Sequence, residues 1–143
     1  MNKLAYIDDC QLDHFILKKI LSRFGSPCEV RCTATGKEAL NLLMRYRYDK
    51  DRLPDMILLD IYMPEFDCWN FLDNVQSLNP TLAKPIEVYI LSASNYPDDV
   101  EQAKRYPCVK AFIRKPITKE VLEQLFKQKG VLLNKFNTLE AQN

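Results

Sequence analysis

The sequence predicts an α/β fold in which helices cover both faces of a parallel sheet, and three features support this. Short apolar runs alternate with longer amphipathic stretches along the chain, which is the order of strands and crossover helices. The apolar runs are continuous, as expected for strands that are buried on both faces. The length of 143 residues and the apolar content of 47% fit one domain with an ordinary core.

Five short apolar runs are the predicted strands. They cover residues 4–7, 29–32, 56–59, 86–91 and 109–113. Each run is followed by a longer segment, and parallel strands need such segments as crossover connections.

The first three connecting segments each carry a helix signal. Apolar residues recur at helical spacing over 12–24, and Gly25 is predicted to end that helix. Thr35 and Glu38 have the spacing of a capping box at the start of the second helix. Asp67 can cap the third helix.

The last two helices are predicted from similar signals. Pro97 fits the first position of the fourth helix, with Lys104 and Arg105 in its last turn, where cations complement the helix dipole. Thr118 is predicted to cap the fifth helix. Residues 130–143 look like a tail that extends this helix or docks on a neighbour.

Composition and charge exclude several classes of function. The net charge of +1 gives no reason to expect a nucleic-acid or membrane partner, and no apolar run is long enough to span a bilayer. With only three glycines, the chain lacks both G-x-G-x-x-G and the P-loop pattern. The five cysteines include no C-x-x-C pair, which favours reduced thiols in the cytoplasm.

Charged or hydroxyl side chains that suit a site of chemistry follow the first, third, fourth and fifth predicted strands. Asp8 and Asp9 follow the first, Asp60 the third, Ser92 the fourth and Lys115 the fifth. In an open sheet of strand order 2-1-3-4-5, ligands bind at the carboxyl ends of the strands, where the order reverses between strands 1 and 3. We therefore expect these five side chains to converge at one edge of the sheet.

This set of side chains indicates phosphoryl chemistry. Three carboxylates brought together either have raised pKa values or are joined by a cation. Oxygen ligands suit a hard divalent ion such as Mg²⁺, or Mn²⁺. A carboxylate can accept a phosphoryl group, while the Lys115 ammonium and the Ser92 hydroxyl can bind its oxygens. The sequence offers no nucleotide pocket and no evident general base for turnover.

The chain resembles the receiver domains of two-component response regulators. Four motifs carry the resemblance, in the family's order and with similar spacing: residues 7–9 (IDD), 58–67 (LLDIYMPEFD), 90–94 (ILSAS) and 112–116 (FIRKP). It implies a flavodoxin-like (βα)5 three-layer sandwich. It also implies a receiver domain over residues 1–129, followed by the tail 130–143.

The resemblance assigns the acidic residues their roles. Asp60 is the implied phosphoacceptor. Asp9 is the implied direct metal ligand, and Asp8 acts largely through water. The backbone carbonyl of Tyr62 completes the protein's share of the Mg²⁺ ligands.

The remaining roles concern the switch. Lys115 pairs with the phosphoryl group, and a cis peptide bond before Pro116 positions it. Ser92 replaces the family's commoner threonine and moves towards the phosphoryl group. Phe112 is the switch aromatic, and the face built from the fourth helix, fifth strand and fifth helix carries the signal.

These roles imply a single-domain response regulator, which is a phosphoacceptor that assists its own phosphorylation and is not a conventional enzyme. The phosphodonor is a sensor histidine kinase or a histidine phosphotransfer protein. Because nothing after Lys129 is long enough for a DNA-binding domain, we expect the output to be a contact with a downstream protein or onward relay of the phosphoryl group. A phosphorylation-promoted homodimer is a further expectation from the family.

One departure from the family pattern leaves an alternative open. Cys68 stands where the family usually has glycine, and a positive φ at this position would disfavour cysteine. The alternative is a protein-interaction module that works without phosphorylation. A haloacid-dehalogenase-type phosphatase is disfavoured because Tyr62 stands where its second aspartate would be, and a flavin carrier because the loop DDCQLD is acidic.

Overall fold

The computed structural model describes residues 2–23, 28–61, 68–93 and 97–127. Strands and helices alternate through these residues, as predicted. The elements are β1 (Asn2–Ile7), α1 (Gln11–Leu21), β2 (Cys28–Thr33), α2 (Gly36–Arg45), β3 (Met56–Asp60), α3 (Cys68–Leu78), the short 3-10 helix η1 (Asn79–Thr81), β4 (Glu87–Ser92), α4 (Pro97–Ala103), β5 (Val109–Arg114) and α5 (Lys119–Lys127).

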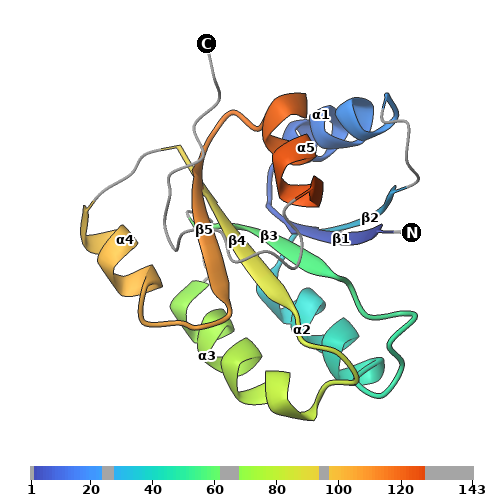
Figure 1. The fold of residues 1–143 in the computed structure, drawn as a ribbon, viewed down its shortest axis with the longest axis vertical. Coiled ribbons are helices and arrows are strands. Elements are labelled where there is room, and N and C mark those ends of the chain that lie inside the picture. The colour runs from blue at the N-terminus through green and yellow to red at the C-terminus, as the bar shows by residue number, and fades with distance from the viewer. Residues whose placement is uncertain (1, 24–27, 62–67, 94–96, 128–143) are drawn as a thin grey trace.

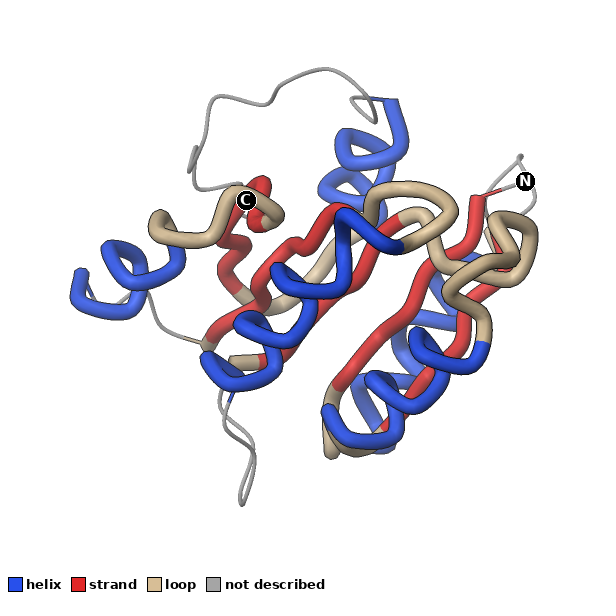
Figure 2. The backbone as a smooth tube through the Cα atoms, turned by 90° about the horizontal axis from the view of Figure 1, so that it is seen from below, coloured by secondary structure: helices blue, strands red, loops and turns tan. Residues whose placement is uncertain are grey.

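The strands form one parallel sheet in the order β2-β1-β3-β4-β5. This order confirms the predicted flavodoxin-like sandwich. Helices α1 and α5 lie on one face of the sheet, and α2 and α3 lie on the other (Figure 1). Helix α4 lies beside the edge strand β5. Figure 2 shows the same layering, with helices on both sides of the strands.

The core consists of two apolar clusters, one on each face of the sheet. Strand β3 lies at the centre, and all five of its residues are buried. Its side chains alternate between the clusters: Ile57 and Leu59 pack towards α2 and α3, whereas Met56 and Leu58 pack towards α1 and α5. Burial on both faces explains why this strand is a continuous apolar run in the sequence.

Several of the predicted helix signals are confirmed. The Thr35 side chain accepts a hydrogen bond from the Glu38 backbone N–H at 3.1 Å, at the start of α2. Pro97 is the first residue of α4. The Thr118 hydroxyl accepts a hydrogen bond from the Val121 backbone N–H at 3.2 Å, at the start of α5.

Two predicted helix ends are wrong, and both helices are shorter than predicted. Helix α1 ends at Leu21, and not at Phe24. Helix α4 ends at Ala103, so Lys104 and Arg105 lie beyond its last turn. Helix α4 stops at Ala103 because the chain must turn there to enter β5. In this turn the Tyr106 N–H donates to the Ala103 carbonyl at 3.1 Å.

Some expectations fall on residues outside the described ranges, namely Gly25, the cap at Asp67 and the tail 130–143. Cys68 is described: it is buried, and it is the first residue of α3. A residue in an α-helix has a negative φ, so cysteine is compatible with the backbone here. In the described ranges, none of the helices combines the length and apolar character of a membrane span.

Candidate functional site

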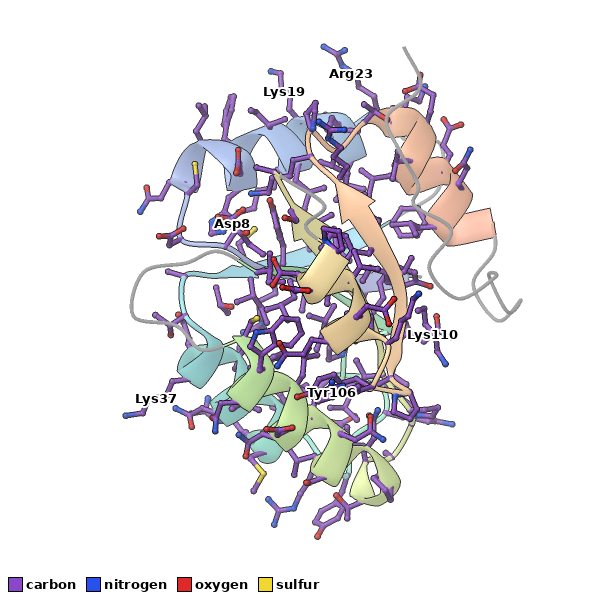
Figure 3. The ribbon with its side chains drawn as sticks, turned by 90° about the vertical axis from the view of Figure 1, so that its left-hand side faces the viewer. Asp8, Lys19, Arg23, Lys37, Tyr106 and Lys110 are labelled. Atoms are coloured by element: carbon purple, nitrogen blue, oxygen red, sulfur yellow. The ribbon has the colours of Figure 1, made fainter. Side chains whose placement is uncertain are left out.

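The carboxyl ends of the strands bring the predicted site residues to one edge of the sheet. Asp60 and Ser92 are the last residues of β3 and β4. Asp8 and Asp9 directly follow β1, and Lys115 directly follows β5. The parallel register places Ile7 beside Leu59 and Asp60 beside Leu91, so the ends of the neighbouring strands are level. Figure 3 shows Asp8 below the start of α1.

The three predicted acidic residues form one cluster. Asp8, Asp9 and Asp60 each offer a carboxylate oxygen, and these oxygens lie within 4.8 Å of one another. The side chains of Asp8 and Asp60 are only 0% and 9% exposed, whereas Asp9 is exposed. Two of the carboxylates are therefore buried, and the cluster reaches the protein surface at the third, Asp9.

Lys115 joins this cluster to α1. Its Nζ donates to Asp8 Oδ2 at 2.9 Å, to Asp13 Oδ2 at 3.0 Å and to Asp60 Oδ2 at 3.3 Å. The side chain is 21% exposed. The ammonium therefore lies among three carboxylates, and it offsets part of their mutual repulsion.

The charges of Asp8 and Lys115 stabilise each other. Burial alone would raise the pKa of Asp8, but hydrogen bonds from the Cys10 backbone N–H, Lys115 and Tyr6 outweigh it and hold that pKa below its usual range. Burial alone would lower the pKa of Lys115, but its bonds to Asp8 and Asp13 and the charge of Asp60 raise it. Both groups are therefore ionised at neutral pH.

Two residues of this network, Tyr6 and Asp13, are not among the site residues predicted from the sequence. The Tyr6 hydroxyl donates to Asp8 Oδ2 at 2.8 Å, and Asp13 binds Lys115. Tyr6 precedes Asp8 by two positions, and such residues share one face of a strand. That spacing was a usable signal for Tyr6. Asp13 could be found only from the angle at which α1 crosses the strand ends, which the sequence does not show.

Of the remaining predicted site residues, Ser92, Phe112 and Pro116 lie within the described ranges. Ser92 is buried, and its backbone carbonyl accepts from the Lys115 N–H at 2.8 Å. The peptide bond between Lys115 and Pro116 is cis. Phe112 is buried in the cluster on the α2 and α3 face. The predicted carbonyl ligand at Tyr62 lies outside the described residues.

Comparison with known proteins identifies the family. Residues 4–127 match the family described as the response regulator receiver domain. The two-component response regulator ORR1 of rice (Oryza sativa subsp. indica) is 27% identical over 135 residues. These cover 89% of this chain but only 54% of ORR1, so the chain spans about half the length of that relative.

Solved structures share the same fold. A two-component response regulator from Cytophaga hutchinsonii has a TM-score of 0.75 and 26% identity, over 90% of this chain and 96% of that chain. The phosphorylated cyanobacterial phytochrome response regulator RcpA has a TM-score of 0.69 and 26% identity, over 93% and 94% of the two chains. The family match includes every described residue of the acidic site. This chain belongs to the response regulator receiver domain family.

Proposed function

We propose that Asp60 accepts a phosphoryl group from a histidine of a kinase or phosphotransfer protein. The observation that carries this proposal is the contact of Lys115 Nζ with Asp60 and with Asp8 beside it. A lysine held by carboxylates at the mouth of a site can bind the oxygens of an anionic group that arrives there. The likeness to RcpA, a regulator solved in its phosphorylated form, also supports the proposal.

The proposed transfer makes and breaks one bond to phosphorus. A carboxylate oxygen of Asp60 attacks the phosphorus, the O–P bond forms, and the N–P bond to the donor histidine breaks. Lys115 offsets the charge on the phosphoryl oxygens, and the Ser92 hydroxyl donates a hydrogen bond to one of them. Attack by water later releases inorganic phosphate and restores the Asp60 carboxylate.

The acidic cluster suits the divalent cation that this family typically binds. Asp8, Asp9 and Asp60 supply oxygen ligands only, as Mg²⁺ and Mn²⁺ prefer. We propose that Asp9 and Asp60 bind the cation directly. Both Asp8 oxygens already accept hydrogen bonds, from Cys10 N–H on Oδ1 and from Tyr6 and Lys115 on Oδ2, so Asp8 would act through water. When bound, the cation supplies positive charge that offsets the charge of the transferred group.

The proposed output is a protein contact on the surface of α4, β5 and α5. Phe112 of β5 packs in the same cluster as Val100 of α4 and Tyr106. A shift of the Ser92 hydroxyl towards a phosphoryl group would change the space available to Phe112 and hence the packing of α4. The same surface would bind the downstream protein or a second phosphorylated copy.

Intact-protein mass after incubation with acetyl phosphate and Mg²⁺ tests the phosphoacceptor. Wild type should gain one phosphoryl group only when Mg²⁺ is present, and Asp60→Asn should gain none. The matched control is Asp98→Asn, which changes an exposed aspartate in the first turn of α4 and should behave like wild type. If Asp60→Asn gains as much as wild type, Asp60 is not the acceptor. If no protein is labelled, even by a histidine kinase, the phosphorylation-independent module takes the place of this proposal.

A further inference from the structure

Asp13 is a carboxylate partner of Lys115 that the proposed phosphoryl transfer does not use. It lies in the first turn of α1, and its Oδ2 is 3.0 Å from Lys115 Nζ. A lysine ammonium has three N–H donors, and Lys115 has three carboxylate contacts. Every donor of the lysine is therefore in use when Asp60 carries no phosphoryl group.

The three contacts differ in how easily they can be given up. Asp8 is fully buried and is also held by the Tyr6 hydroxyl at 2.8 Å and the Cys10 N–H at 2.9 Å. Releasing Lys115 from Asp8 would leave a buried carboxylate with one partner fewer, which is costly. Asp13 is 32% exposed, so water can replace the lysine there. Asp60, at 3.3 Å, is itself the proposed acceptor of the phosphoryl group. Of the other two partners, Asp13 is the one that Lys115 can leave at the lower cost.

We propose that Asp13 is a positioning residue that competes with phosphorylated Asp60 for Lys115. This competition lowers the affinity of the domain for a phosphoryl group on Asp60. The inference rests on the proposed function, because it assumes that Lys115 binds the phosphoryl oxygens. A lysine that is already saturated must release one acceptor before it takes another. Asp13 keeps Lys115 at the mouth of the site in the resting state, and its release is part of the cost of the phosphorylated state.

The predicted consequence is a gain in binding when Asp13 loses its charge. Asparagine has nearly the same size as aspartate but competes less strongly for an ammonium. The beryllium trifluoride anion serves as a non-covalent probe, because it binds to a carboxylate as a phosphoryl group does. With Mg²⁺ at saturation, Asp13→Asn should bind the probe about fivefold more tightly than wild type, the size expected for a partly exposed ion pair.

Two further variants separate competition from other effects. Glu123→Gln is the matched charge control, since Glu123 lies on α5, is 43% exposed and faces Lys119 at 3.7 Å; it should leave the affinity unchanged. Lys115→Gln tests whether the gain acts through the lysine. In that background, adding Asp13→Asn should give no gain, whereas a general effect of charge on anion binding would persist.

The outcomes distinguish this inference from the proposed function. The competition is supported if Asp13→Asn binds the probe more tightly than wild type and this gain disappears in the Lys115→Gln background. Glu123→Gln should then bind the probe with the affinity of wild type. Equal or weaker binding of the probe by Asp13→Asn, or a gain that persists without Lys115, overturns the competition. If wild type still binds the probe in that case, the proposed function stands. If wild type does not bind the probe even at saturating Mg²⁺, the proposed function and this inference both fail.

Discussion

The hydrogen bond from Tyr6 to Asp8 gives a direct test of how the site is stabilised. Tyr6→Phe removes the hydroxyl that donates to Asp8 Oδ2 at 2.8 Å and leaves the buried ring in place. A hydrogen bond to a charged group contributes about 1.5–3 kcal/mol. Because Oδ2 keeps its bond to Lys115, we expect the lower end of this range, about 1.5 kcal/mol. For a domain of this length that loss corresponds to a Tm lower by about 3–6 °C.

A second tyrosine provides a matched control. Tyr89 is 1% exposed, as Tyr6 is, and its hydroxyl donates at 2.9 Å to Glu87. In both pairs the carboxylate is two positions from the tyrosine, but Asp8 follows Tyr6 whereas Glu87 precedes Tyr89. Glu87 is only half-buried, so water can replace that bond. Tyr89→Phe should therefore cost less than about 1 kcal/mol. Urea denaturation and thermal melts of the three proteins, in buffer with a metal chelator, give the comparison.

The effect of Tyr6→Phe should also depend on pH. The pKa of Asp8 lies below its usual range in the folded protein, against its burial, and the Tyr6 hydroxyl is one of the groups that lower it. Such a carboxylate contributes stability that is present above its unfolded pKa and is lost as the pH falls through its folded pKa. The difference between wild type and Tyr6→Phe should therefore be full at neutral pH and shrink in acid. Equal losses for Tyr6→Phe and Tyr89→Phe at neutral pH would refute this reasoning.

Two other predictions concern the start of α3 and the metal. Cys68→Gly should destabilise the domain by about 1–2 kcal/mol, because glycine is unfavourable in a helix and leaves the buried Cys68 site partly empty. Urea denaturation measures this change, and a stabilised variant would mean that this position needs a positive φ. Mg²⁺ should raise the Tm of wild type through binding to the folded state. Asp9→Asn should lose most of this rise in Tm, since Asp9 is the exposed member of the acidic cluster. An undiminished rise would mean that the ion binds away from Asp9.

The fold could be predicted from the sequence because the decisive signals are local. The continuous apolar run of β3 and the polar residues that end β1, β3, β4 and β5 are all visible in the sequence. Together with the general rule for open sheets, they were enough to place Asp8, Asp60 and Lys115 together. Helix ends were harder to predict. Lys104 follows α4 because the chain must turn towards β5, and that requirement comes from the tertiary structure.

The electrostatic network could be predicted only in part. The acidic cluster follows from strand order, whereas the contact of Asp13 with Lys115 joins residues 102 positions apart and depends on how α1 crosses the strand ends. The pKa of Asp8 could not be predicted either. Three neighbouring carboxylates alone indicate raised pKa values, and the donors Tyr6, Cys10 and Lys115 reverse that direction for Asp8.

The most direct measurement is to locate the phosphoryl group along the chain. Protein treated with acetyl phosphate and Mg²⁺ is reduced with borohydride, which converts an aspartyl phosphate to homoserine, and is then digested and sequenced by mass spectrometry. We predict homoserine at position 60 alone, and none when Mg²⁺ is omitted. Homoserine at position 8, 9 or 13, with Asp60 unchanged, would contradict the assignment of Asp60 as the phosphoacceptor.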